Sequence, residues 1–331
     1  MHPVIGRFLL WSQRGRTIRS AAIIEREGVT IMAKKSNFLK GGGWYKGNTH
    51  LHTTLSDGAL EPAAAAAIYK EAGYAFLVMT DHWVYGNHTE LQSDDFLLFA
   101  GMEMDIGVSP ELGFCHHVTV MADPAQTPYH MGDTLPEIRA LGDMKTMVEQ
   151  MNRSGHICIY AHPNWSHIGF AEYSRIDGCI GVEVYNHICE AGAGSGYGDA
   201  YYDRKLWTRT HCFCFASDDA HGQEHTLGGF IGVKAAELTH HAIMDAIRAG
   251  SFYASTGPEI LDFYVEDGRV FVECSPCSDI TLYSDAFCGV HMVKNKPGTT
   301  KASYPVPANA VNVYITCREG GGKAWSQPIW L

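Results

Sequence analysis

The sequence lacks any apolar run near the roughly 18 residues that are needed to cross a bilayer. Its 331 residues are 46% hydrophobic and 18% charged, which is the composition of a water-soluble globular protein. It also lacks a signal-peptide core, because the longest apolar stretch near the start is only Phe8-Leu9-Leu10-Trp11. We therefore expect a cytoplasmic protein with no membrane partner.

A basic stripe is absent as well. The formal net charge is -11 at pH 7, with 25 Lys and Arg residues against 36 Asp and Glu residues. Such a surface repels polyanions, so nucleic acid is not an expected partner. We expect a small-molecule substrate instead, and the composition leaves the oligomeric state open.

Complete cysteine motifs are absent although the chain has 10 cysteines. The tight pairs are Cys212/Cys214, at strand spacing among aromatic residues, and Cys274/Cys277 on either side of Pro276. Neither has a second pair to complete a zinc site, and a chain of this size does not need disulfides for stability. We therefore predict ordinary buried thiols.

Residues 1–43 differ in character from the rest of the chain. Arginines are frequent between Arg7 and Arg26, and a second methionine, Met32, opens a more ordinary sequence. We predict a disordered N-terminal extension over residues 1–43, and residues 1–31 can be an upstream segment with no folded role.

From Trp44 onward, apolar runs of strand length alternate with helical segments. Helices that end near a glycine are predicted at Glu61–Ala72, Leu135–Arg153 and Thr239–Ala249. Uniformly apolar runs predict strands buried on both faces of a parallel sheet: Ala75–Met79, Phe96–Ala100, Ile157–Ala161, Ile180–Val184 and His211–Ala216. The alternation indicates an α/β architecture over residues 44–257.

The pattern changes after about Pro258, where short alternating stretches replace the long helices. Residues 258–331 are predicted to form a small antiparallel β domain. The C-terminus carries Trp325 and Trp330, and exposing so apolar a segment costs about 25 cal/mol per Å². We therefore expect this β domain to pack on the larger one.

Polar clusters stand directly after the apolar runs. They are Thr80-Asp81-His82, Gly101-Met102-Glu103, His162-Pro163-Asn164 and Ser217-Asp218-Asp219-Ala220-His221, with His50-Leu51-His52 and Asp57 before the first helix. The C-terminal ends of the strands of a parallel barrel open onto one face, so these side chains are expected to converge. Imidazole and carboxylate groups are ligands for zinc, manganese and iron, and a carboxylate can bridge two ions.

Each of these residues also has an ordinary explanation when taken alone. A single His at a strand end is more often a hydrogen-bonded structural residue than a ligand, and Asp57-Gly58 is a common turn pair. Together, however, unpaired His and Asp at so many strand ends would cost on the order of several kcal/mol if no metal paired with them. The combination predicts a multinuclear metal site.

The order HxH, SDG, TDH, GxE, HPN and SDDAH resembles the PHP (polymerase and histidinol phosphatase) superfamily of metal-dependent phosphoesterases, over about Gly47 to Gly257. The phrases EVYN (Glu183–Asn186), FYASTGPEI (Phe252–Ile260) and AWSQPIWL (Ala324–Leu331) resemble its carbaryl-hydrolase-like subgroup. The resemblance implies a distorted (β/α)7-type barrel that holds two or three divalent ions (Mn, Zn or Fe).

The resemblance also implies a set of ligands. The first ion would be held by His50, His52, Glu103 and Asp219, the second by Glu103, His117 and His162, and the third by Asp57, His82 and His221. The family pattern favours His117 over its neighbour His116, which is the alternative. Many members have His at the place of Asp57, so the third site here has an oxygen ligand and its occupancy is open.

Further roles are predicted around these ligands. Asp81 is expected to orient His82 in the catalytic centre, and either His82 or His221 can supply the proton that a leaving group needs. Candidate substrate contacts are Asn164, Asn186, His187 and Arg204, although capping or simple solvation explains each of them equally well.

These residues predict a metal-dependent hydrolase, and the resemblance makes it a phosphoesterase. A metal-bridging hydroxide would attack a small, phosphorylated mono- or diester. The alternative is hydrolysis of carbamate, ester or amide bonds by the same centre, because the same nucleophile attacks a carbonyl carbon. A non-catalytic metal-binding module is least favoured, because every mapped position carries a competent ligand.

Overall fold

The computed structural model describes residues 24–26, 29–31, 34–109, 113–286 and 291–331. The chain divides into two compact units, Met1–Ala33 and Lys34–Leu331. In the first unit, β1 (Ile24–Arg26) pairs antiparallel with β2 (Val29–Ile31). The rest of the predicted disordered segment up to residue 33 lies outside the described residues, and its disorder stays a prediction.

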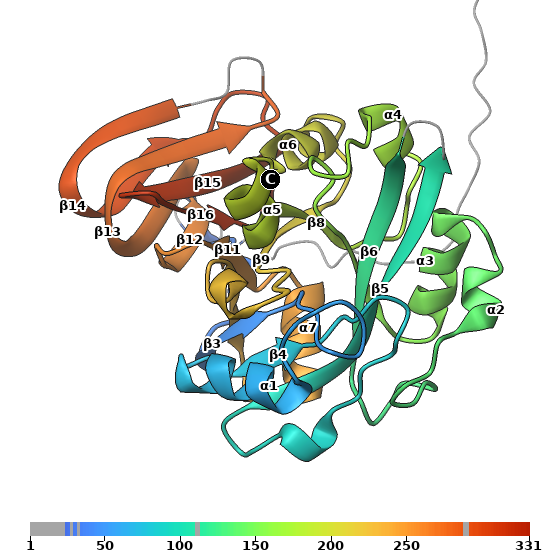
Figure 1. The fold of residues 1–331 in the computed structure, drawn as a ribbon. Coiled ribbons are helices and arrows are strands. Elements are labelled where there is room, and N and C mark those ends of the chain that lie inside the picture. Colours follow the sequence, from blue (N-terminus) through green and yellow to red (C-terminus); the bar gives the residue numbers. More distant parts are fainter. Residues whose placement is uncertain (1–23, 27–28, 32–33, 110–112, 287–290) are drawn as a thin grey trace, which may run out of the picture. The chain divides into compact units, whose positions relative to one another are not determined.

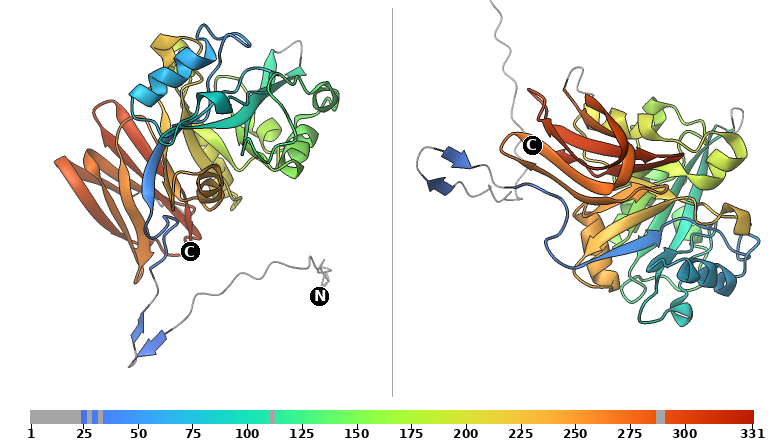
Figure 2. Two further views of the ribbon diagram at one scale, coloured as in Figure 1. Left: turned by 90° about the horizontal axis from the view of Figure 1, so that it is seen from below. Right: turned by 90° about the vertical axis from the view of Figure 1, so that its left-hand side faces the viewer.

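The second unit is built on one long mixed sheet (Figures 1 and 2). Its first part follows chain order: β3 (Gly43–Asn48), β4 (Phe76–Val78), β5 (Leu97–Ser109), β6 (Phe114–Ala122), β7 (Ile157–Tyr160), β8 (Gly181–Asn186) and β9 (Phe213–Ser217). A parallel bridge between Leu51 and Ala220 joins the segments that follow β3 and β9. The two ends of this strand series are therefore brought together.

The five strands predicted from the apolar runs all run in the same direction, but the sheet is mixed because it also contains β6, for which no strand was predicted. The pairs β3–β4, β4–β5, β7–β8 and β8–β9 are parallel, whereas β6 runs antiparallel to both β5 and β7. Only residues 110–113 separate β5 from β6, which is too short a connection for a crossover helix. The reversal places the first half of β6 at the edge where the parallel strands end.

Helices connect these strands along the chain: α1 (Pro62–Glu71), η1 (Thr89–Leu91), α2 (Pro136–Arg139), α3 (Met144–Arg153), α4 (Phe170–Tyr173), α5 (His187–Ala193), α6 (Asp199–Trp207), η2 (Gln223–His225) and α7 (His240–Arg248). The helix predicted over residues 135–153 is divided in two. Gly142 adopts φ +65°, and the Asp143 carboxylate accepts a hydrogen bond from the Thr146 amide at 2.9 Å. This local cap starts a new helix.

Antiparallel strands follow: β10 (Phe230–Ala235), β11 (Phe252–Ser255), β12 (Ile260–Glu266), β13 (Arg269–Ser284), β14 (His291–Pro305), β15 (Asn312–Glu319), β16 (Gly322–Ser326) and β17 (Ile329–Trp330). The sheet continues without a break from β3 through β10, β11 and β16 to β15, β13 and β12. Ala254 of β11 pairs with Trp325 of β16, which is fully buried. The β-rich segment thus shares a sheet with the preceding strands, and a domain boundary at residue 258 stays a prediction.

Residues 34–43 pack on this β-rich segment, which differs from the expected disorder. Lys35 forms an antiparallel bridge with Val265, and the Ser36 hydroxyl donates to the main-chain oxygen of Phe263 at 2.8 Å.

Among the described residues, no helix combines the length and apolar character that a membrane crossing requires.

Candidate metal centre

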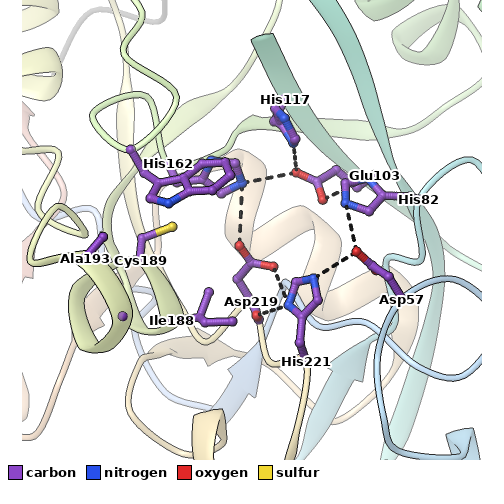
Figure 3. Close-up of a pocket in the computed structure, with 12 residues that line it drawn as sticks. Asp57, His82, Glu103, His117, His162, Ile188, Cys189, Ala193, Asp219 and His221 are labelled. Carbon is purple, nitrogen blue, oxygen red and sulfur yellow. Dashed lines mark hydrogen bonds and ion pairs between the residues drawn. The ribbon is translucent and has the colours of Figure 1, made fainter. Parts of the chain in front are cut away.

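A cavity of about 490 Å³ opens where β3, β4, β7 and β9 end. Figure 3 shows residues that line it. Seven of the nine predicted metal ligands line it: Asp57, His82, Glu103, His117, His162, Asp219 and His221. The other two, His50 and His52, are buried and contact the carboxylates of this wall. The structure therefore brings all nine together, while their role as ligands stays a prediction.

The deepest group contains His50, His52, Glu103 and Asp219. Nε2 of His50 lies 3.2 Å from Oε2 of Glu103 and 3.2 Å from Oδ1 of Asp219. Nε2 of His52 lies 3.1 Å and 3.0 Å from the same two oxygens. The two-residue spacing of the histidines thus aims both rings at one point, and this is the group predicted for the first ion.

Glu183 determines how His50 presents its ring. Nδ1 of His50 lies 2.9 Å from Oε1 of Glu183, and since an ionised carboxylate only accepts hydrogen bonds, this nitrogen carries the proton. In the neutral ring, the lone pair is then on Nε2 and faces oxygens of Glu103 and Asp219. These atoms repel one another unless a cation lies among them, so the donor set fits a divalent ion.

Glu103 connects this group to a second one. Its other oxygen, Oε1, lies 2.9 Å from Nδ1 of His117 and 3.3 Å from Nε2 of His162. The alternative ligand His116 turns away from the cavity, where its Nδ1 forms a hydrogen bond with the Tyr160 hydroxyl. Of the two neighbours, His117 is the one that faces the centre.

The third predicted group lies at the open mouth. Oδ2 of Asp57 lies 3.3 Å from Nε2 of His221 and 4.0 Å from Nε2 of His82, and Oδ1 lies 3.4 Å from Nδ1 of His52. The Asp57 side chain is 54% exposed, whereas that of Glu103 is 1% exposed. Water can therefore compete with these side chains for a bound ion more strongly here than at the other two groups.

The carboxylates create a strongly cation-attracting site. Burial lowers the pKa of His52, but its hydrogen bonds to Asp219 and Glu103 outweigh burial and raise the pKa to about 9. Burial likewise lowers the pKa of His117, whereas the charge of Glu103 raises it to about 10. Burial raises the pKa of Glu103, and the surrounding histidines bring it well below its usual range. The same fields attract divalent ions.

Two of the predicted ligands have unusual backbones. His162 has φ +23° and Asp219 has φ +52°, in the left-handed region that non-glycine residues seldom occupy. Such conformations cost on the order of 1–3 kcal/mol and are concentrated at functional sites. The fold thus holds both side chains toward the cavity at the expense of local strain.

Asp81 contacts the segment that leads from β3 to α1. Its carboxylate accepts hydrogen bonds from the amide and hydroxyl of Thr53 at 2.8 Å each and from the Ser56 hydroxyl at 2.8 Å. It does not line the cavity. Asp81 thus shapes the turn that carries Asp57, and its predicted role in orienting a ligand stays a prediction.

The candidate substrate residues also lie away from the cavity lining. Asn186 is fully buried, caps α5 by accepting from the Cys189 amide, and donates to Asp219 at 3.1 Å. Asn164 is exposed and donates to the main-chain oxygen of Ser195.

His187 and Arg204 have other partners. Nδ1 of His187 lies 2.8 Å from the Tyr185 hydroxyl, and the Arg204 guanidinium stacks 4.7 Å from the ring centre of Phe170. His187 directly follows the end of β8, and the direction of each side chain is set by local contacts that the sequence pattern does not contain.

Three residues that sequence reasoning did not assign contribute to the site. Glu183 also accepts hydrogen bonds from the His162 amide and from Asn186, and an acidic residue within an apolar run was an available signal. Asp105 lies 3.3 Å from Nδ1 of His82, and its two-residue spacing from Glu103 could have indicated it. Trp165 forms one wall, and no sequence signal marks it.

No protein-family model matches the chain. It is 27% identical over 153 residues to the DNA polymerase/3'-5' exonuclease PolX of Bacillus subtilis (strain 168), with 41% of this chain and 26% of that protein covered. The chain thus spans about a quarter of the length of this curated relative.

Solved structures are similar as well. A two-domain protein of Bacteroides vulgatus that contains a predicted PHP-like metal-dependent phosphoesterase matches with a TM-score of 0.46 and 15% identity, covering 86% of this chain and 93% of that one. A lesion-specific endonuclease of Pyrococcus furiosus matches with a TM-score of 0.39 and 12% identity, covering 63% and 56%. These are similarities to known structures at low sequence identity, and the carbaryl-hydrolase-like subgroup stays a prediction.

Proposed function

We propose that this chain is a metal-dependent hydrolase, and specifically a phosphoesterase for small phosphate mono- or diesters. The observation that carries the proposal is the position of Glu103, whose two oxygens face two different groups of imidazole nitrogens. A carboxylate placed in this way is suited to bridge two ions. The nearly closed series of strands from β3 to β9 supports the proposed distorted (β/α)7-type barrel.

Two or three divalent ions are proposed, from Mn, Zn and Fe. His50, His52, Glu103 and Asp219 would hold one, and His117 and His162 would hold a second together with Glu103. When bound, such ions supply an activated water nucleophile and withdraw charge from the scissile ester. Asp57, His82 and His221 would hold a third ion at the exposed mouth, where an oxygen ligand favours a harder ion.

The chain's own residues would handle the leaving group. His82 and His221 line the mouth with side chains 27% and 26% exposed, so they can reach both substrate and solvent. Nδ1 of His221 lies 2.9 Å from the main-chain oxygen of Asp219, which fixes its proton there and directs Nε2 toward Asp57. When no third ion occupies the mouth, either ring in its protonated form could deliver a proton to a departing alkoxide.

The cavity wall limits the substrate. Beside the ligands it is formed by Trp165, Ile188, Cys189, Gly192 and Ala193, and no Lys or Arg side chain is among the described lining residues. A substrate with several phosphates would meet no cationic side chain beyond the metal centre. We therefore propose a small ester whose leaving group has an apolar portion.

The apolar cavity wall also favours a second candidate function. Carbamates, carboxylic esters and amides carry no charge that needs a cationic side chain, so an apolar wall beside a metal centre also suits them. A metal-activated hydroxide could attack either phosphorus or a carbonyl carbon. The side chains of the cavity wall would therefore determine which substrate binds.

The test uses chelator-treated protein reconstituted with Mn²⁺ or Zn²⁺. Its substrates are p-nitrophenyl phosphate, bis(p-nitrophenyl) phosphate, p-nitrophenyl acetate and a single-stranded oligonucleotide. We expect metal-dependent release of p-nitrophenol from a phosphate ester, lost in Glu103→Gln and retained in Asp267→Asn, which removes an exposed carboxylate. Preferential turnover of the acetate supports the second function, and preferential cleavage of the oligonucleotide contradicts the small-substrate proposal. No metal-dependent turnover of any substrate contradicts both hydrolase functions.

A further inference from the structure

Three cysteines outside the candidate metal centre gather in the β-rich segment. Cys274 and Cys277 lie on β13, and Cys317 lies on the neighbouring strand β15. Their sulfur atoms all lie within 4.8 Å of one another. The side chains are buried, with exposed fractions of 2%, 0% and 0%. The third sulfur comes from a residue 40 positions beyond Cys277, which the spacing of the pair could not indicate.

An irregularity in β13 makes this gathering possible. In a regular strand, residues three positions apart point to opposite faces of the sheet. The pairing of β13 with β14 shifts register on both sides of Cys277, between Glu273 and Cys277 and again between Cys277 and Asp279. Such bulges redirect side chains, and here both sulfurs reach the same side as Cys317.

The bulge is fixed in place by its own contacts. Ser275 exchanges two hydrogen bonds with Glu259: its amide donates to the main-chain oxygen of Glu259, and its hydroxyl accepts from the Glu259 amide, both at 2.9 Å. Pro276 has no amide hydrogen to leave unpaired where the ladder is interrupted. The CxxC segment is therefore held in a defined shape before any ligand binds.

The separations suit a metal ion. Tetrahedral zinc with bonds of about 2.3 Å to thiolate places its sulfur ligands about 3.8 Å apart, and a soft sulfur set selects thiophilic ions. The main-chain oxygen of Thr299, 4.0 Å from the Cys274 sulfur, stands on the β14 side of the cluster. A water or a main-chain oxygen on that side would complete the fourth position.

Ordinary packing is the competing explanation, because cysteine often serves as a small buried hydrophobe. It accounts for the burial of each thiol but not for the bulge that turns Cys274 and Cys277 to one side. We propose that Cys274, Cys277 and Cys317 form a structural site for one thiophilic divalent ion, Zn²⁺ in the cell, that fastens β13 to β15. This site is independent of the proposed hydrolase function.

Cadmium is the probe, because thiolate binding to Cd²⁺ gives an ultraviolet charge-transfer band that His, Asp and Glu ligands do not give. Cd²⁺ is titrated into full-length, reduced, chelator-treated protein. We expect the band to saturate at about one thiolate-bound ion per chain. It should be lost in Cys277→Ser and Cys317→Ser and kept in Cys158→Ser. Cys189→Ser, which removes the thiol of the hydrolase cavity, should also keep it.

A second measurement covers the case in which the serine variants do not fold. Wild-type protein with and without Zn²⁺ is alkylated in mild denaturant, and the cysteine peptides are quantified by mass spectrometry. Zinc should protect Cys274, Cys277 and Cys317 several-fold more than Cys158. Equal protection of all cysteines, no cadmium band in the wild type, or a disulfide between two of the three in the native protein would each overturn the proposal.

Discussion

Glu103 is the residue on which the two-ion proposal depends most, because each of its oxygens faces a different group of histidines. Asp219 is nearly as central, since it contacts His50 and His52 through Oδ1. Both carboxylates are almost fully buried, so solvent has little access to these two predicted ligands.

Glu103→Gln and Asp219→Asn should therefore each lower turnover by more than about a hundredfold, because each removes charge that holds the ions. Asparagine tolerates the left-handed backbone at position 219, so the fold should be kept. Asp267→Asn is the matched control, with an exposed carboxylate at φ +47°. Kinetics at saturating metal and circular dichroism check this, and unchanged turnover in either centre variant would contradict the assignment.

Asp57→Ala should be milder, because its side chain is 54% exposed and belongs only to the third group. A loss of turnover as large as that of Glu103→Gln would show that the third group is as essential as the other two.

His156 makes a pH-dependent contribution to the stability of the fold, at a position outside the candidate metal centre. Burial lowers its pKa to about 4, against main-chain contacts that raise it, and its Nε2 accepts from the Tyr85 hydroxyl at 2.7 Å. Between pH 6.5 and about pH 4, His156 is protonated in the unfolded chain but neutral in the folded protein. The contribution of His156 to the free energy of unfolding therefore falls as the pH falls.

His156→Gln should therefore lose less stability than the wild type between about pH 7 and about pH 4.5, by on the order of 2 kcal/mol. Urea unfolding at the two pH values measures the difference. His130→Gln, at a position with an 86% exposed side chain, should follow the wild type. Parallel pH dependences for wild type and His156→Gln would show that the buried imidazole does not contribute.

At the scale of elements, the sequence predicted the ends of two helices and the common direction of five strands, but it did not predict β6. The ends of α1 and α7 follow from local signals, Pro62 at the start of α1 and the Thr239 cap of α7. No strand was predicted at β6, because its first half, Phe114 to His117, interrupts the apolar pattern with polar residues. The predicted helix over residues 135–153 is divided because Gly142 adopts a left-handed backbone, which a single glycine in a helical pattern does not reveal.

Gln327 links the C-terminal strands to β9. Its side-chain oxygen accepts from the Cys214 amide and its side-chain nitrogen donates to the Cys214 carbonyl oxygen, both at 2.9 Å. The Gln327 side chain thus pairs with the Cys214 main chain as the backbone of an adjacent strand would. Gln327→Leu would leave both buried groups unpaired and should lower the free energy of unfolding by about 2 kcal/mol or more. Gln223→Leu, at an exposed position, should change it by less than about 0.5 kcal/mol. Equal effects in urea unfolding would contradict this link.

At the scale of the whole molecule, the motif order and the family resemblance together named nine histidines and carboxylates that do gather, but they missed Glu183 and Asp105. Several of the nine follow strand ends that the apolar runs mark, whereas Glu103 and His117 lie within β5 and β6. The substrate residues could not be predicted in the same way, because the directions of Asn186, His187 and Arg204 depend on neighbours far apart in sequence. The Trp165 wall likewise arises only in three dimensions.

The most direct test of the account is elemental analysis of the protein after reconstitution with Mn²⁺ or Zn²⁺, comparing wild type with Glu103→Gln. The thiolate cluster contributes equally to both, so the difference reports on the candidate metal centre. Beyond the one ion assigned to the thiolate cluster, we expect at least about two ions per wild-type chain, because the candidate ligands are too many for one ion with four to six positions, and fewer ions in Glu103→Gln. Fewer than about one ion per wild-type chain, or equal content in the two proteins, would contradict a multinuclear centre built on Glu103.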